Sequence, residues 1–296
     1  GGGSGASGGA RALPQTFRKP NWFKINRLTV GERASFVLGA IADHGLNTVC
    51  TSAACPNKGT CFSEGTATFM ILGDICTRAC RFCNIRTGRP EEEDLQEGER
   101  LADAAAKMGL KFVVLTSVCR DDLPAEGAGA FARTLRALAE RIPGVRVEVL
   151  TPDFLGREDC LRTILEARPH VFNHNLETVE RLTPKIRTKA RYYRSLSVLN
   201  TIRNMEPNLP TKSGLMVGLG ETREEMKQAF HDLSGVGIER LTIGQYLQPT
   251  RLHHPVIRYY EPQEFVELRE EAKAAGIPAV LSGPLVRSSY HAGTFE

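Results

Sequence analysis

Three cysteines in one short loop carry the clearest chemical signal of this chain. Cys76, Cys80 and Cys83 are spaced C-x3-C-x2-C. Three thiolates can bind three irons of a cubane cluster and leave the fourth open, whereas common four-cysteine clusters close all four positions. An open iron can bind an amino and a carboxylate group, as reductive cleavage of S-adenosylmethionine requires. Zinc is the alternative, but it favours paired C-x2-C motifs and four closed ligands, so the spacing favours a radical-forming iron–sulfur cluster.

A second cysteine triplet lies upstream of the first. Cys50, Cys55 and Cys61 are spaced C-x4-C-x5-C, and Cys61 precedes Cys76 by 15 positions. Three more thiols so close predict a second cluster that lacks one protein ligand. A zinc-binding or unligated extension is the alternative, because soft thiolates bind iron–sulfur clusters and zinc alike.

The distribution of the cysteines also indicates the cellular compartment. Six of the eight lie within residues 50–83 of a long chain, unlike the dense cysteines of a short secreted scaffold. No apolar signal segment follows the Gly-rich residues 1–10, so a reducing location, the cytoplasm, is expected. The two remaining cysteines, Cys119 and Cys160, have no cysteine neighbour in the sequence and are predicted to be structural core residues.

The composition is that of an ordinary globular protein, with 41% hydrophobic and 24% charged residues. The formal charge of +4 without a clustered Lys/Arg run does not favour nucleic-acid binding, although it suits a mildly acidic protein partner. No apolar run of about 18 residues occurs, so no membrane span is predicted.

Strands and helices alternate along most of the chain. The alternating Val145, Val147 and Val149 are typical of a strand, whereas Leu101, Ala104 and Met108 fall on one helical face. Strands are predicted at 67–72, 111–115, 145–149, 170–172, 215–219, 241–243 and 279–281. Helices are predicted at 33–44, 101–108, 131–142, 161–165, 196–202, 226–233 and 265–275. About six βα units predict a parallel sheet with crossover helices, curved into a full or partial barrel.

The carboxyl ends of the predicted strands are where a barrel gathers its chemistry. The first strand runs directly into the loop of Cys76, so this loop stands at the right end. Polar residues at the other strand ends are predicted to contact S-adenosylmethionine, namely Thr116, Ser117, Asn175, Glu177, Arg194 and Glu221. The alternative is that these side chains cap helices.

The motifs together resemble those of the lipoyl synthase family. The likeness rests on both cysteine triplets and on Arg287-Ser288-Ser289-Tyr290 near the C-terminus, and it extends over about residues 21–292. Matching segments are NTVC at 47–50, CPN at 55–57, GTATF at 65–69, NHNLE at 173–177, GLMVGLGE at 214–221 and GQYLQPT at 244–250. One departure is Cys119, which stands where the family usually has an acidic residue.

The resemblance implies a partial (β/α)6-type radical S-adenosylmethionine barrel with extensions at both ends. We expect residues 21–65 to form an N-terminal extension carrying the auxiliary-cluster cysteines, and residues 66–276 to form the barrel. Residues 277–296 would then be a C-terminal segment with the serine ligand. Residues 1–20 begin with a Gly/Ser-rich stretch and are predicted to be a flexible leader.

The resemblance also implies the activity. A lipoyl synthase uses two [4Fe–4S] clusters and S-adenosylmethionine to insert two sulfurs, by radical chemistry, at C6 and C8 of a protein-bound octanoyl-lysine. The auxiliary cluster donates the sulfurs and takes a serine as its fourth ligand, which we assign to Ser289, with Ser288 as the alternative. Implied partners are the octanoylated carrier domain of a 2-oxoacid dehydrogenase E2 or glycine cleavage H protein, a low-potential flavodoxin or ferredoxin, and an iron–sulfur carrier.

Two other functions are possible from the sequence. Another two-cluster radical enzyme, such as a methylthiotransferase or biotin synthase, would share the Cys76 triplet but lack the RSSY segment and the spacing of the first triplet. A non-catalytic iron–sulfur carrier would leave the barrel and the region of Glu221 without a use.

Overall fold

The computed structural model describes residues 18–23, 32–49, 57, 61, 67–290 and 292–293. The predicted leader therefore lies outside the described residues up to residue 17. Two short N-terminal elements precede the barrel, η1 (Asn21–Phe23) and α1 (Glu32–Asp43). Within the described ranges, no helix has the length and apolar character needed to cross a membrane.

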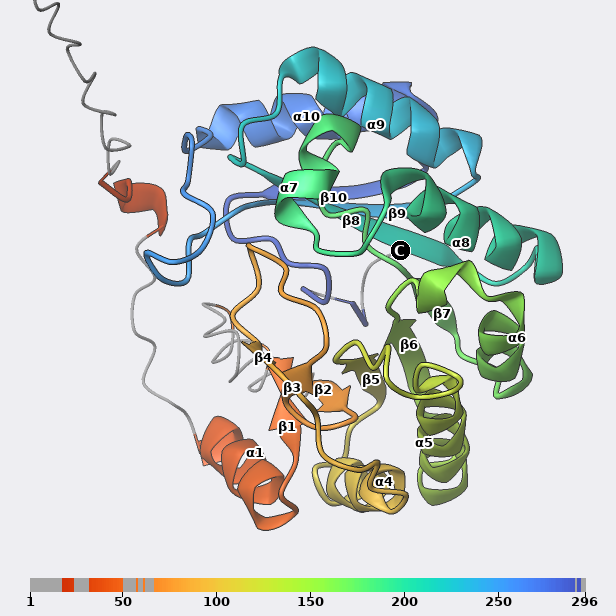
Figure 1. The fold of residues 1–296 in the computed structure, drawn as a ribbon. Helices are drawn as coiled ribbons and strands as arrows, with labels where there is room; N and C mark the ends of the chain where they lie inside the picture. Colours follow the sequence, from red (N-terminus) through yellow and green to blue (C-terminus); the bar gives the residue numbers. More distant parts are fainter. Residues whose placement is uncertain are drawn as a thin grey trace, which may run out of the picture.

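An eight-stranded sheet forms the centre of the molecule (Figure 1). Its strands, in spatial order, are β1 (Asn47–Thr48), β2 (Ala67–Ile71), β5 (Phe112–Ser117), β6 (Arg146–Leu150), β7 (Val171–Asn173), β8 (Thr211–Val217), β9 (Arg240–Gln245) and β10 (Ala279–Gly283). From β2 to β10 every neighbouring pair is parallel, and only β1 is antiparallel. The predicted parallel sheet is confirmed.

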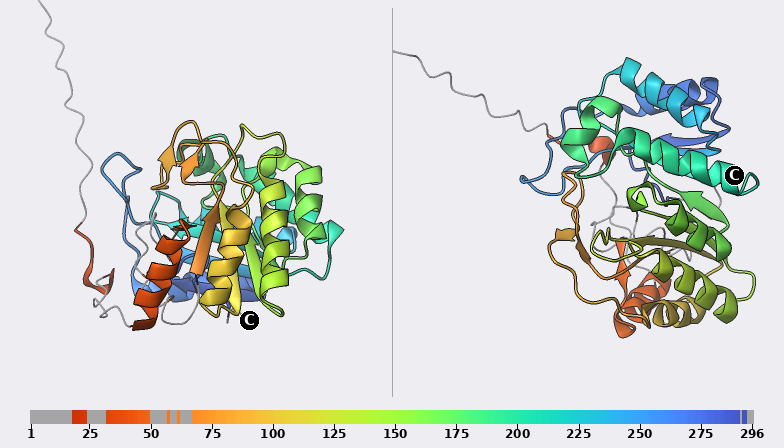
Figure 2. Two further views of the ribbon diagram at one scale, coloured as in Figure 1. Left: turned by 90° about the horizontal axis from the view of Figure 1, so that it is seen from below. Right: turned by 45° about the vertical axis from the view of Figure 1, so that its right-hand side comes forward.

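Six helices connect the seven parallel strands. They are α4 (Glu97–Lys107), α5 (Ala128–Arg141), α6 (Glu158–Glu166), α8 (Tyr192–Met205), α9 (Arg223–Gly235) and α10 (Pro262–Ala274). These helices cover the outer face of the curved sheet (Figure 2). Among the described strands no pairing joins β10 to β1 or β2, so the barrel is partial, as predicted.

The alternation of side chains along each strand separates an outer core from the barrel interior. On β5, Val113 and Leu115 are fully buried among the apolar faces of the helices, where they pack in one cluster with Phe131 of α5. Burying each such side chain contributes about 1.5–3 kcal/mol. Phe112 and Val114 alternate with them and lie on the interior side.

The barrel interior contains a buried ion pair and the end of the chain. Lys212 of β8 lies 3.0 Å from both carboxylate oxygens of Glu148 of β6, and neither side chain is exposed. At the amino-terminal ends of the strands, Ala292 packs on Phe112, and the carbonyl of Gly293 accepts a hydrogen bond of 3.0 Å from Arg146. The C-terminal residues therefore lie at the end of the barrel opposite to the cysteine loop.

Candidate functional site

The loop of Cys76, Cys80 and Cys83 lies over the carboxyl ends of the strands, on the side that faces the viewer in Figure 1. Cys76 ends the short strand β3 (Ile75–Cys76), which pairs with β4 (Arg86–Thr87). The amide and the hydroxyl of Thr77 both donate to the carbonyl of Cys119, each at 3.0 Å. These bonds join the start of the cysteine loop, beside Cys76, to the loop that follows β5.

Arg78, for which the sequence predicted no role, anchors this loop from inside. Its side chain is buried; Nη1 lies 2.7 Å from Asp153 and Nη2 lies 2.7 Å from Asp121. Asp121 follows β5 and Asp153 follows β6, so one guanidinium holds the loop to two strand ends. Nη1 of Arg194 lies 3.3 Å from Asp153, and the predicted contact of Arg194 with S-adenosylmethionine stays a prediction. The sequence did contain a signal for this anchor, namely an arginine between two cysteines and an aspartate after each of two predicted strands.

Cys119 lies beside Cys76, and its structural role stays a prediction. Its backbone amide donates to Sγ of Cys76 at 3.3 Å, and the amide of Arg78 donates to the same sulfur at 3.4 Å. A hydrogen bond with the Cys119 side chain, together with these amides, lowers the pKa of Cys76 to about 6 against the opposing effect of burial. This shift favours the thiolate, the metal-binding form, at Cys76. Cys160 is buried, with its thiol 3.5 Å from a backbone carbonyl, as a structural residue should be.

The other two cysteines are deprotonated less easily. Burial is the largest effect on both thiols and raises the pKa of Cys80 and, to about 12, that of Cys83. Bound iron supplies the positive charge that such thiols need to ionise. In the part of the chain that the structure describes, no three His, Cys, Asp or Glu side chains converge on the position of a single metal ion. A cubane does not need this convergence, since each cysteine binds a different iron.

Two further loops pack directly on the cysteine loop. The amide of Arg81 donates to Ile186 and its carbonyl accepts from the amide of His254, both at 2.8 Å. Nε2 of His253 lies 3.0 Å from the carbonyl of Cys83, and Nε2 of His254 lies 2.9 Å from another backbone carbonyl. Both imidazoles therefore bond to backbone carbonyls and help to hold these loops together.

Orphaned polar atoms mark the strand ends where S-adenosylmethionine was predicted to bind. Oγ of Ser117, Oγ1 of Thr151 and Oδ1 of Asn175 are buried without a hydrogen-bond partner among the described residues. Leaving such a group unpaired costs about 1–3 kcal/mol, so a polar ligand at this position fits them. Ser117 ends β5, Thr151 directly follows β6 and Asn175 follows β7, so three neighbouring strand ends each contribute one of these atoms.

Glu177, which is half-buried, has a strained backbone beside these atoms. Its φ of +67° lies in the left-handed region, which a non-glycine residue rarely adopts. Its carboxylate accepts a hydrogen bond of 3.0 Å from Nδ2 of Asn175, and burial raises the pKa of this carboxyl. Such strain persists only where the surroundings impose it, and it concentrates at functional sites.

Two of the predicted contact residues have partners within the protein. Oγ1 of Thr116 donates to the carbonyl of Leu150 on β6 at 2.7 Å. The carboxylate of Glu221 accepts the amides of Gly218, at 2.6 Å, and Leu219, at 2.9 Å. These side chains stabilise the strand end and the glycine turn, and their contact with S-adenosylmethionine stays a prediction.

The N-terminal triplet is described only in part. Cys50 and Cys55 lie outside the described residues, whereas the amide of Cys61 donates to the carbonyl of Asn57 at 3.0 Å. Nδ2 of Asn57 donates in turn to the carbonyl of Leu285 at 2.7 Å, across 228 positions of sequence. This bond joins the segment of the triplet to the C-terminal segment that leads into Ser288 and Ser289.

The C-terminal segment is seated tightly on β9. A Cβ on Gly244 would lie 2.1 Å from the carbonyl oxygen of Val286, so only glycine allows this approach. Nη1 of Arg287 lies 3.3 Å from the carbonyl of Gln245, the last residue of β9. Arg287, the first residue of the RSSY segment, is thus held at the carboxyl end of β9.

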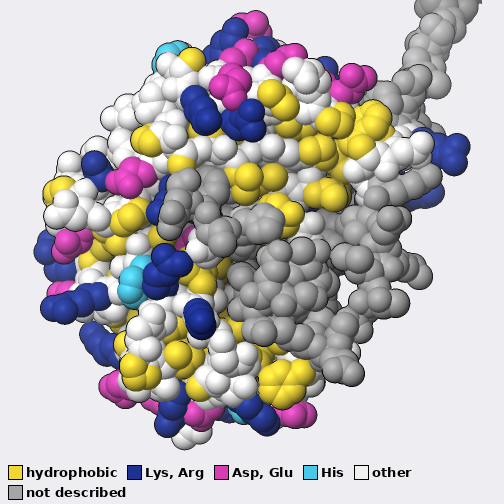
Figure 3. All heavy atoms as spheres, turned by 180° about the vertical axis from the view of Figure 1, so that it is seen from behind, with side chains coloured by type: hydrophobic (Ala, Val, Ile, Leu, Met, Phe, Trp, Pro, Cys, Tyr) yellow, Lys and Arg dark blue, Asp and Glu magenta, His cyan; other side chains and the backbone are white. Residues whose placement is uncertain are grey.

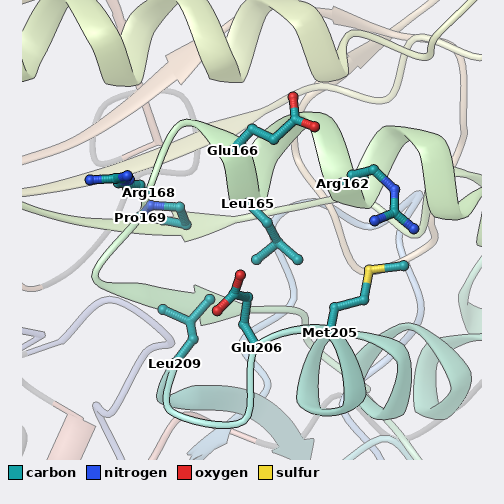
Figure 4. A pocket seen from close by; sticks show the side chains of 8 residues that line it. All are labelled: Arg162, Leu165, Glu166, Arg168, Pro169, Met205, Glu206 and Leu209. Atoms are coloured by element: carbon teal, nitrogen blue, oxygen red, sulfur yellow. The ribbon is translucent and has the colours of Figure 1, made fainter.

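A surface groove of about 660 Å³ lies away from these residues, between α6 and α8 (Figure 4). Leu165 and Glu166 end α6, and Glu206 and Leu209 directly precede β8. The groove is therefore at the amino-terminal ends of the strands, where barrel enzymes do not place their chemistry.

The comparisons with known proteins agree with this geometry. Residues 70–233 match the radical SAM superfamily. The chain is 52% identical to the lipoyl synthase of Shouchella clausii (strain KSM-K16), over 94% of this chain and 90% of the relative. It is also 52% identical to the lipoyl synthase of Rubrobacter xylanophilus (strain DSM 9941), over 93% of this chain and 85% of the relative. The chain belongs to the lipoyl synthase family.

Solved structures with little sequence similarity share the fold of this family member. Methylornithine synthase superposes with a TM-score of 0.53 at 14% identity, over 72% of this chain and 70% of that one. Coproporphyrinogen III oxidase from Escherichia coli, a radical SAM enzyme, gives a TM-score of 0.52 at 13% identity, over 71% and 51%. These likenesses confirm the predicted fold class, the partial barrel.

Proposed function

We propose that this chain is a lipoyl synthase, which inserts two sulfur atoms at C6 and C8 of an octanoyl chain on a lysine of a lipoyl-carrier domain. Relatives of that name are about half identical over nearly the whole chain. Within the structure, the hydrogen bond between Asn57 and Leu285 carries the proposal. It joins Asn57, which lies between Cys55 and Cys61 in the sequence, to the residue two positions before Arg287, and this supports a site shared by the two segments.

Cys76, Cys80 and Cys83 would hold the radical-forming cluster. When bound, this cluster supplies the electron that cleaves S-adenosylmethionine reductively, with a 5′-deoxyadenosyl radical as the agent of hydrogen abstraction. The chain contributes the thiolate of Cys76 and the buried cation of Arg78, which fixes the loop. An unactivated C–H bond offers no acidity, so no acid–base pair is needed.

The strand ends would hold S-adenosylmethionine. Ser117 and Asn175 offer hydrogen-bonding atoms without partners among the described residues, and Asn175 also orients Glu177. A ligand ammonium beside Glu177 would favour the ionised carboxylate against the effect of burial. Thr116, Arg194 and Glu221 would support these residues through the internal hydrogen bonds described above.

The second triplet, Cys50, Cys55 and Cys61, would hold the auxiliary cluster, which is consumed as the sulfur donor. Ser289 would be its fourth ligand, with Ser288 as the alternative. An oxygen ligand is harder than a thiolate and suits a soft iron–sulfur cluster poorly. The iron at this serine would therefore be the one released most easily when sulfur is removed.

The proposed partners follow from this reaction. The acceptor would be the carrier domain of a 2-oxoacid dehydrogenase E2 or of glycine cleavage H protein, the electron donor a flavodoxin or ferredoxin, and an iron–sulfur carrier would rebuild the spent cluster. Thiolate ligands need a reducing compartment, and we place the enzyme in the cytoplasm. Residues 21–65, 66–276 and 277–296 would be its extension, barrel and C-terminal segment.

Anaerobic reconstitution followed by turnover tests the proposal. The enzyme would be incubated with reductant, S-adenosylmethionine and an octanoyl-lysyl carrier, and both 5′-deoxyadenosine and the carrier mass would be measured. We expect both products, and free octanoate should be a poor substrate. Replacing Cys76, Cys80 and Cys83 with alanine should abolish both. A wild-type protein that binds clusters without forming 5′-deoxyadenosine would be a non-catalytic carrier instead.

A further inference from the structure

Three loops around the cysteines contain positive charge only. Residues 76–89 contain four Arg, residues 183–194 contain five Lys or Arg, and residues 247–260 contain two Arg. None of these segments contains an Asp or Glu, although the whole chain has a net charge of only +4. The charge is therefore segregated in the sequence, and the fold determines whether it is also segregated in space.

The fold brings these three segments together. The backbone of Arg81 bonds on one side to Ile186, in the second segment, and on the other to His254, in the third. The loop after β9, the short helix α7 (Thr183–Ile186) and the cysteine loop lie on the same side of the molecule in Figures 1 and 2. At the opposite end, shown in Figure 3, acidic and basic side chains are interspersed.

Several of these cations are exposed and have no ion-pair partner among the described residues. They include Arg81, Lys185, Arg191 and Arg251. Other cations of the three loops pair with carboxylates, such as Arg86 with Asp74. Leu252, beside Arg251, is 91% exposed, the most exposed of the large hydrophobic side chains described. We call Arg81, Lys185, Arg191, Arg251 and Leu252 the basic rim.

We propose that the basic rim is the docking surface for an acidic electron-transfer protein, which delivers the reducing electron to the cluster held by Cys76, Cys80 and Cys83. The inference rests on the proposed function. Attraction between opposite charges accelerates the encounter of two proteins. Electron-transfer complexes have small interfaces, and one exposed leucine surrounded by cations suits an interface of that size. The donor, a flavodoxin hydroquinone for example, loses one electron and becomes a semiquinone, and the cluster gains that electron.

An electron donor fits the basic rim better than the octanoylated carrier does. Arg81 is exposed and lies between Cys80 and Cys83, so a single loop separates a docked protein from the cluster ligands. His253 extends this path through its contact with the carbonyl of Cys83. An octanoyl arm needs an opening, whereas backbone hydrogen bonds of 2.8 Å close the loops together beneath the rim. An electron needs only proximity.

A pair of charge reversals tests the inference. In the reconstituted enzyme, Lys185→Glu with Arg251→Glu should weaken the binding of an oxidised, acidic flavodoxin about tenfold or more at low salt. The rate of cluster reduction by flavodoxin hydroquinone should fall as much, while reduction by methyl viologen radical, a small cation, should not fall. Wild-type binding should weaken as salt is raised. Arg136→Glu with Arg162→Glu, the same charge change on exposed positions of α5 and α6, is the matched control and should bind flavodoxin normally.

The outcomes separate the possibilities. Unchanged flavodoxin binding by the Lys185/Arg251 variant would overturn the inference, and a raised KM for the octanoylated carrier in the same variant would assign the rim to the carrier. Equal weakening by the control would also overturn it, because net charge alone would then explain the effect. If the wild-type enzyme makes no lipoyl product with a chemical reductant, the proposed function fails, whereas the docking result stands or falls separately.

Discussion

Replacing Arg78 with alanine should release the cysteine loop from the barrel. The guanidinium holds Asp153, which is fully buried, and Asp121, which is 12% exposed, at 2.7 Å each. Removing one partner of a buried ion pair leaves an uncompensated charge and costs about 3–5 kcal/mol. The control is Arg86→Ala in the same loop, whose ion pair with Asp74 is largely exposed and is worth about 0–1 kcal/mol.

Iron content and unfolding measure these two effects. With one four-iron cluster lost, Arg78→Ala should retain about four of about eight irons after reconstitution, and its midpoint of denaturation should fall. Arg78→Lys keeps the charge but loses the two-sided fork geometry, so it should lie between. If Arg78→Ala bound all the iron and unfolded like Arg86→Ala, the anchoring role of the guanidinium would be refuted.

Three further predictions concern the C-terminal segment and the buried histidine. Ser289→Ala should spare S-adenosylmethionine cleavage but impair sulfur insertion, as measured by 5′-deoxyadenosine against carrier mass; a normal rate of insertion would move the assignment to Ser288. Gly244→Ala should displace the same segment, because its Cβ would lie 2.1 Å from a backbone oxygen, and it should likewise spare 5′-deoxyadenosine formation but impair sulfur insertion. The control is Gly235→Ala, whose Cβ has open space around it, and equal behaviour of the two variants would contradict the packing argument. Burial lowers the pKa of His174 to about 4 from 6.5, so between these pH values the unfolded chain takes up a proton that the folded chain does not. The free energy of unfolding should therefore fall by up to about 3 kcal/mol as pH drops from 6.5 to 4. In denaturant titrations His174→Gln should show a smaller dependence of this free energy on pH, and an unchanged dependence would refute the prediction.

The parts of the fold that depend on local periodicity were predictable from the sequence. The alternating valines at 145, 147 and 149 predicted β6, and the helical spacing of Leu101, Ala104 and Met108 predicted α4. The two-residue strand β1 was not predicted, because two residues carry no period and its pairing with β2 is set by the tertiary fold.

The cysteine ligands of the site stay predictions, whereas the residues that support their loop were not predictable from the sequence. Cysteine spacing is local, so the first triplet and its place after a strand were evident. Arg78 meets its partners Asp121 and Asp153 across 43 and 75 positions, and Asn57 meets Leu285 across 228. Such contacts depend on which strands become neighbours. The proximity of Cys119 to Cys76 arises in the same way, from a strand end that the sequence alone could not bring to the loop.

The origin of the inserted sulfur tests the central claim most directly. Enzyme reconstituted with 34S-sulfide would be transferred to unlabelled medium and given octanoyl-lysyl carrier, S-adenosylmethionine and reductant for a single turnover. The proposed function predicts that both sulfurs of the product carry the label, and that the variant lacking Cys50, Cys55 and Cys61 forms 5′-deoxyadenosine without sulfur insertion. Unlabelled sulfur in the product, or normal insertion by that variant, would contradict the assignment of the second triplet as the sulfur donor.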